Sequence, residues 1–137
     1  MNRPLGLLGC VFGFVAVAAG AFGAHALRDR LPADLLAVFE TGVRYQMGHA
    51  LALLFVAVVG GARGARLTRV AGWFFVAGIL VFSGSLYLLA LTGVRAWGAV
   101  TPFGGVAFLL GWALLAWGVM RPASSGPGAS LPRDGVD

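Results

Sequence analysis

Four long apolar runs, separated by short polar segments, dominate the pattern of hydrophobic and polar positions along the chain. They cover residues 5–27, 42–61, 67–91 and 102–120. Each is close to the roughly 20 residues that a helix needs to cross a hydrocarbon core about 30 Å thick. The runs are continuous rather than alternating, and backbone polar groups must be satisfied inside lipid. The pattern therefore predicts four transmembrane helices.

The segment "PADLLAVFETGVRYQ" between the first two runs has a different pattern. Pro32 suits a first helical turn, and Asp34 follows where the helix dipole favours an acid. At about 100° per residue, one side carries Leu35, Leu36, Val38, Phe39 and Val43, and the other carries Asp34, Glu40, Thr41 and Arg44. We expect a short amphipathic helix at about residues 32–41, lying along the membrane surface and either continuing through Gly42 into the second span or bending there.

Composition supports a membrane protein. The 137 residues are 59% hydrophobic and only 11% charged, whereas a soluble domain is usually about 25% charged. The predicted fold is an all-α, integral membrane four-helix bundle. A cleaved signal peptide is the alternative for the first run, but its apolar core exceeds the usual length of about 7–15 residues. The single cysteine, Cys10, excludes an intrachain disulfide.

All ten basic residues are arginine and occur singly at the ends of apolar runs. They form no stripe that could bind phosphates, so nucleic-acid binding is not expected. Four spans put both termini on one side, together with the arginine-rich loop "ARGARLTR". The positive-inside rule predicts that this side is the cytoplasm of a cell inner membrane. The tail at residues 122–137 is rich in Pro, Gly and Ser, and we expect it to be disordered and cytoplasmic.

Small residues recur at spacings that let helix backbones approach closely in lipid. The predicted packing positions are Gly9, Gly13, Gly20, Gly23, Gly78, Gly84, Gly104, Gly105 and Gly111. They predict a tight bundle, and one stripe could also form a homodimer.

Ionisable and polar side chains within spans are costly in lipid and are therefore candidates for function. The candidate polar site comprises His25, Glu40, Arg44, Tyr45, His49, Ser85 and Tyr87. Glu40 and Arg44 are four residues apart and can pair on one helix face, as can Tyr45 and His49. His25 ends the first span, and His49 is expected about one turn inside the second. A helix hairpin could then bring the two histidines together near the outer interface.

Several functions fit this cluster. The pairs could be structural locks, or two histidines could ligate a haem. A transition metal could bind His25, His49 and Glu40. A quinone head group could be held by Arg44, Tyr45 and His49. A proton or ion path could run from Glu40, Arg44 and His49 towards Ser83, Ser85 and Tyr87. The sequence lacks a phosphate loop, a nucleophile elbow, a metal-ligand cluster and paired carboxylates, so enzyme activity is not favoured.

Four motifs occur in order: "GAFGAHAL", "FETGVRYQMGHALALL", "FSGSLYLLALTG" and "TPFGGVAFLLGW". Together they resemble the family named for transmembrane protein 256 and domain of unknown function 423. The resemblance covers roughly residues 5–119 and implies a small four-span membrane protein without an established activity. The family's recurring positions correspond here to Gly23, His25, Glu40, Arg44, Tyr45, His49, Ser85, Tyr87, Gly104 and Gly105. Bacterial members commonly have "YQMYH", whereas this chain has Gly48 before the second histidine.

The leading hypothesis is a non-enzymatic accessory or scaffold component of the inner membrane. It would contact the lipid bilayer and associate with itself or with a larger membrane complex. The alternative is a small ligand or ion site for quinone, haem or a proton at the outer mouth, built from His25, Glu40, Arg44, Tyr45 and His49. The sequence identifies no particular cofactor.

Overall fold

Four long helical rods make up the computed structural model, which describes residues 2–59 and 65–120. The first rod is α1 (Arg3–Phe22) with the π-helical turn η1 (Gly23–Leu27), and the second is α2 (Ala33–Val59). The third joins α3 (Ala65–Gly78), the π-helical turn η2 (Ile79–Ser83) and α4 (Gly84–Thr92). The fourth begins with the 3₁₀ turn η3 (Arg95–Ala99) and continues as α5 (Thr101–Met120). Each rod is long and apolar enough to span a membrane, which confirms the predicted all-α class.

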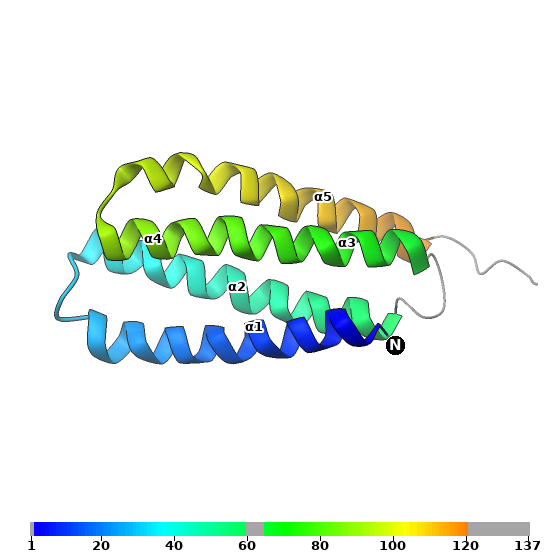
Figure 1. Ribbon diagram of the computed structural model, residues 1–137, viewed down its shortest axis with the longest axis horizontal. Helices are drawn as coiled ribbons and strands as arrows, with labels where there is room; N and C mark the ends of the chain where they lie inside the picture. The colour runs from blue at the N-terminus through cyan, green and yellow to red at the C-terminus, as the bar shows by residue number, and fades with distance from the viewer. Residues whose placement is uncertain (1, 60–64, 121–137) are drawn as a thin grey trace, which may run out of the picture.

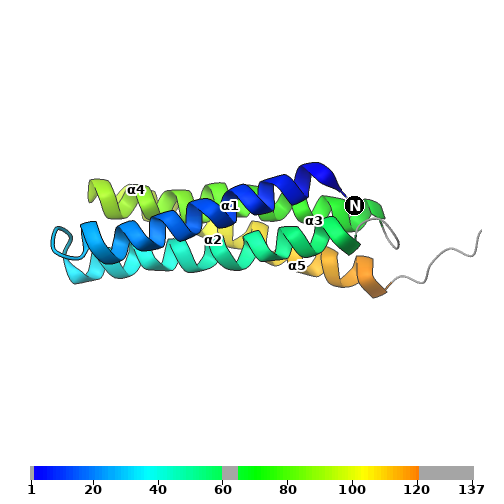
Figure 2. The ribbon, with the colours of Figure 1, turned by 90° about the horizontal axis from the view of Figure 1, so that it is seen from below.

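The rods run up and down in sequence order (Figure 1), so the amino end of α1 and the carboxyl end of α5 lie at the same end of the bundle. The view turned by 90° also shows the four rods lying along one common axis (Figure 2). α1 packs mainly on α2, and α3 packs mainly on α5, while α2 contacts α3, η2 and α4. The first and fourth rods are 17% and 28% buried over their most apolar windows, against 44% for the second and the third. α1 and α5 are therefore the outer helices.

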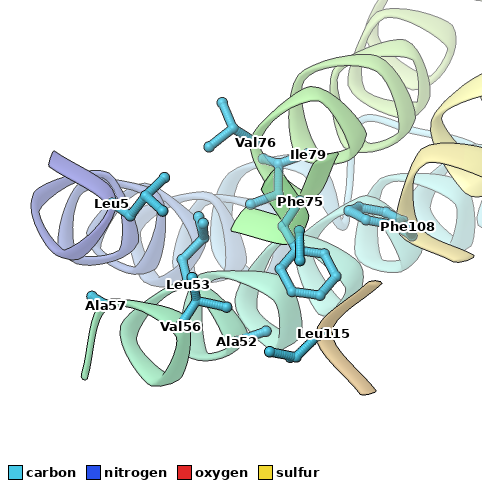
Figure 3. Packing of buried hydrophobic residues seen from close by; sticks show 11 residues of the cluster. Leu5, Ala52, Leu53, Val56, Ala57, Phe75, Val76, Ile79, Phe108 and Leu115 are labelled. Carbon is cyan, nitrogen blue, oxygen red and sulfur yellow. The ribbon is translucent and has the colours of Figure 1, made fainter. Parts of the chain in front are cut away.

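The main core lies in the half of the bundle that contains the amino end of α1. Figure 3 shows Leu5, Leu53, Val56, Phe75 and Leu115 converging there from four different helices. A smaller cluster of Leu27, Phe39 and Ala90 closes the other half. Between these clusters, the helices are joined by aromatic and polar side chains.

The expected surface helix at residues 32–41 is the first part of α2, which runs without interruption from Ala33 to Val59. Its predicted apolar side is confirmed, and that side packs against the rest of the bundle. Phe39 is buried with Leu27 and Ala90, and its ring centroid lies 4.9 Å from that of Tyr87. Gly42 lets α4 pack closely against α2, because a Cβ there would lie 2.9 Å from the Tyr87 ring.

Close helix contacts occur at most of the predicted packing glycines, and at Gly104 the close contact is with the backbone of another helix. A Cβ there would overlap the backbone of Phe82, at 2.7 Å from its Cα. At Gly9, a Cβ would lie 3.1 Å from the carbonyl oxygen of Ala50, and Gly111 faces the Phe75 ring at 2.6 Å. Gly84 differs from the prediction, since a Cβ there would meet no atom within 4 Å.

Close or ordinary packing surrounds the remaining predicted glycines. They are Gly13, Gly20, Gly23, Gly78 and Gly105. The predicted tail at residues 122–137 and residues 60–61 of the second apolar run lie outside the described residues.

Candidate functional site

A hydrogen-bonded bridge at Gln46 joins three helices inside the bundle. Gln46 lies on α2 and is 3% exposed. Its Nε2 donates to the backbone oxygen of Phe12 on α1 at 2.9 Å, and its Oε1 accepts from the Tyr87 hydroxyl on α4 at 2.9 Å. Both ends of the amide are therefore satisfied by other helices. In lipid such interhelical bonds link neighbouring helices, because lipid offers no alternative partner for either group.

His49 forms a second link, across the space between α2 and α5. Its Nδ1 lies 2.8 Å from the carbonyl oxygen of Tyr45, which can only accept, so we assign the ring proton to Nδ1. Nε2 then accepts from the Trp112 indole N–H at 3.2 Å. The imidazole also stacks on Phe108, with ring centroids 3.5 Å apart and an angle of 11° between the planes. Both ring nitrogens are therefore engaged with other groups of the protein.

Ser85 and Tyr87 serve different contacts because residues two apart point to nearly opposite sides of a helix. The Ser85 hydroxyl lies 2.9 Å from the Phe82 carbonyl oxygen and 2.8 Å from the Thr101 hydroxyl, which starts α5. Tyr87 faces Gln46 on α2. The Ser83 hydroxyl is fully buried without a hydrogen-bond partner in the described part of the chain. Within the described part of the chain, Ser83, Ser85 and Tyr87 are not hydrogen-bonded to one another.

Three ionisable residues of the predicted site lie apart from these links. His25, Glu40 and Arg44 are exposed. The Arg44 guanidinium donates to the Thr41 hydroxyl at 3.0 Å. The predicted Glu40–Arg44 ion pair is not formed among the described residues, because Arg44 turns towards Thr41 instead.

The expected approach of His25 to His49 is also not found. α1 and α2 are antiparallel, and Gly23 lies against Phe39 while Gly13 lies against Ala50. His25 is thus separated from His49 by about 18 Å along the bundle, at about 1.5 Å per residue. The error came from starting the second span at Gly42. Since α2 begins at Ala33, His49 lies well inside the bundle rather than at its mouth.

This separation does not fit a haem ligated by both histidines or a metal held by His25, His49 and Glu40. Ligation through His49 would also require displacing Trp112 or the Tyr45 carbonyl. Within residues 2–59 and 65–120, no group of three or more His, Cys, Asp or Glu side chains converges.

A lateral groove of about 420 Å³ lies between α2 and α5, beside His49. Rings supply much of its lining, from Tyr45 and His49 on α2, Phe82 on η2, and Phe108 and Trp112 on α5. Gly105 and Pro102 form the part nearest the start of α5. α2 and α5 are not among the closely packed helix pairs, so the gap between them is spanned by side chains. Of the predicted site, only Tyr45 and His49 line this groove.

Sequence reasoning missed two central residues of the links. Neither Gln46 nor Trp112 is among the site residues predicted from the sequence. A signal was present in both cases, because an amide or an indole N–H deep in an apolar run needs a partner inside lipid.

The family model described as "Protein of unknown function (DUF423)" matches residues 19–105. The chain belongs to this family. The UPF0382 membrane protein YwdK of Bacillus subtilis is 46% identical over 80% of this chain and 89% of its own length. The UPF0382 inner membrane protein YgdD of Escherichia coli is 42% identical over 88% of this chain and 92% of its own length. No solved structure matches the chain.

Membership of the DUF423 family agrees with the four apolar helices and with the resemblance inferred from the sequence motifs. The chain is thus a membrane protein of a family without an assigned activity. The names of its relatives give a location and no substrate.

Proposed function

We propose that this DUF423 protein is a non-enzymatic accessory or scaffold component of the membrane. The observation that carries this proposal is the pairing of polar side chains between helices: Gln46 with Tyr87, His49 with Trp112, and Ser85 with Thr101. A catalytic site needs reactive groups aimed at a substrate, whereas these groups are bound to one another. These hydrogen bonds between helices, which we call interhelical locks, fix the position of each helix along its neighbours.

The outer helices supply the surface for association. Phe14 on α1 is 75% exposed, and Phe103 and Leu109 on α5 are 73% and 72% exposed. Such faces contact lipid or another membrane helix. We propose that they contact a second copy of this chain or a larger membrane complex.

The partner proposal is tested by crosslinking in intact membranes, with a photoreactive amino acid in place of Phe14 or Phe103. A photoreactive group at Val76, which is 9% exposed in the core, is the matched control. We expect specific protein adducts from the exposed positions and none from Val76. Lipid adducts alone from Phe14 and Phe103 would contradict the scaffold proposal.

We also propose that the membrane is the inner membrane and that both termini are cytoplasmic. Arg28, Arg30 and Arg95 would then lie at the outer end, opposite Arg3 and Arg66. The test uses a Cys10→Ser background with cysteine placed at Arg95 or at Asn2. A membrane-impermeant maleimide added to spheroplasts should label the Arg95 position and leave the Asn2 position unlabelled. The reverse pattern would overturn the assigned orientation.

A further inference from the structure

Tyr45 has an unusual position for a tyrosine in a membrane helix. It lies about 18 Å from the Ala33 end of α2 and about 21 Å from the Val59 end, at about 1.5 Å per residue. Tyrosine normally occurs at the membrane interface, where its hydroxyl is hydrated. Here the side chain is 45% exposed in the middle of the bundle, and its hydroxyl makes no hydrogen bond within the described residues. An unpaired hydroxyl in hydrocarbon is costly, so this position favours a partner with an acceptor atom.

The surroundings of Tyr45 define the shape of that partner. Tyr45 lines the groove between α2 and α5, where the Phe82 ring centroid lies 4.5 Å from its own and the Phe108 centroid lies 6.2 Å away. Trp112 lines the same groove. Several rings around one slot favour a flat ligand, because aromatic rings prefer offset-stacked or edge-to-face contacts with one another.

The polarity of the groove limits the ligand further. The Trp112 indole N–H is taken up by His49, which leaves the Tyr45 hydroxyl as the donor that the groove-lining side chains can offer a ligand. The remaining lining is apolar and comes from side chains such as Val106 and Leu109. Diacyl lipids carry their ester carbonyls near the headgroups, about 15 Å from the centre of a hydrocarbon layer about 30 Å thick. A ligand with its acceptor at mid-depth must therefore be almost entirely apolar.

We propose that the groove between α2 and α5 binds the ring of a membrane-soluble quinone, with one ring carbonyl accepting a hydrogen bond from the Tyr45 hydroxyl. The ring lies among Tyr45, Phe82, Phe108 and Trp112, and the apolar chain extends into the lipid. Binding alone is proposed, without electron transfer. The proposal goes beyond the scaffold function and does not depend on it.

The test follows the fluorescence of Trp112, which is isolated by replacing Trp73, Trp97 and Trp117 with phenylalanine. Decylubiquinone is titrated into the protein in mild detergent, because a quinone bound in contact with an indole quenches its emission. We expect saturable quenching. Tyr45→Phe keeps the ring but loses the hydroxyl, and should weaken binding about 3- to 10-fold, as expected for one hydrogen bond.

A matched pair of glycine substitutions tests the location. Gly105→Leu places a side chain in the groove, and its Cβ would meet only the Phe82 ring at 3.9 Å, so the fold should be kept. Gly84→Leu adds the same side chain where a Cβ meets no atom within 4 Å. Gly105→Leu should abolish saturable binding, and Gly84→Leu should retain it. Circular dichroism during heating verifies that both variants remain folded.

Linear, unsaturable quenching that is equal in all variants would overturn the proposal, because the quinone would merely dissolve in the micelle. Binding that survives Gly105→Leu would also overturn it. Calorimetric titration with decylubiquinone compares the same variants in a chain that keeps all four tryptophans. It thereby excludes an effect of the tryptophan substitutions on binding. A change in oligomeric state with Gly105→Leu, without any quinone binding to the unsubstituted chain, would assign the groove to a second copy instead.

Discussion

Replacing Gly104 with alanine should destabilise the protein by about 2–3 kcal/mol, the upper part of the range for overpacking a tight contact. The added Cβ would overlap the backbone of Phe82 and lie 2.7 Å from its Cα. A side chain could rotate away, but a helix backbone can respond only by moving the whole rod. α5 would therefore separate from η2, and the neighbouring Ser85–Thr101 hydrogen bond would lengthen.

The adjacent glycine provides the control. A Cβ at Gly105 would lie 3.9 Å from the Phe82 ring, which is an ordinary contact. Gly105→Ala should change the free energy of unfolding by no more than about 0.5 kcal/mol, as expected for a substitution that removes no contact. Denaturant titration of both variants in the same detergent measures the difference. Equal effects of the two substitutions would show that α5 does not approach η2 as closely as described.

Replacing His49 with alanine should have the second large effect, about 2–4 kcal/mol. His49 is 8% exposed and fills the space beside Phe108, so its removal leaves a cavity. It also removes the acceptor of the Trp112 N–H, which is then left without a partner in an apolar environment. The cavity and the unpaired N–H both weaken the contact between α2 and α5. This contact depends on side chains, because the two helices are not a closely packed pair.

The effect of Arg44→Ala distinguishes the observed Arg44–Thr41 contact from the Glu40–Arg44 pair predicted from the sequence. A structural Glu40–Arg44 pair at the outer mouth would make Arg44 the more sensitive residue, since removing one member leaves an uncompensated partner. In the structure Arg44 is exposed and donates only to Thr41. The substitution should therefore change stability by about 0.5 kcal/mol or less. Thermal unfolding of His49→Ala and Arg44→Ala shows which substitution lowers stability more. A larger loss of stability for Arg44→Ala would support a structural Glu40–Arg44 ion pair instead.

The four spans could be predicted from the sequence because few backbone structures can satisfy their own hydrogen bonds in hydrocarbon. Continuous apolar runs of sufficient length must be helices, and their ends follow from charge and turn residues. The amphipathic sides of the segment before Gly42 were also predictable from helical periodicity. Its place in the bundle was not, because the same pattern suits a membrane surface or a helix interface, and only the contact of Phe39 with Leu27 and Ala90 decides between them.

The candidate site was predicted less well, because its geometry depends on the register between helices. The sequence identified Tyr45, His49, Ser85 and Tyr87 as polar residues within apolar surroundings. The hydrogen-bond partners of His49, Ser85 and Tyr87 lie up to 63 residues away along the chain, and periodicity within one helix cannot pair them. An error of one turn in the predicted start of the second helix changes the predicted position of His49 along the bundle by about 5.4 Å.

The central claim is that polar side chains in the spans are interhelical locks, and a double-mutant cycle on Gln46 and Tyr87 tests it most directly. Gln46→Leu, Tyr87→Phe and the double variant are unfolded under the same conditions as the parent protein. We predict a coupling free energy of about 0.5–1.5 kcal/mol, the range found for hydrogen bonds between membrane helices, because either single change leaves its partner unpaired. Strictly additive effects would contradict the claim, since Gln46 and Tyr87 would then contribute nothing to each other.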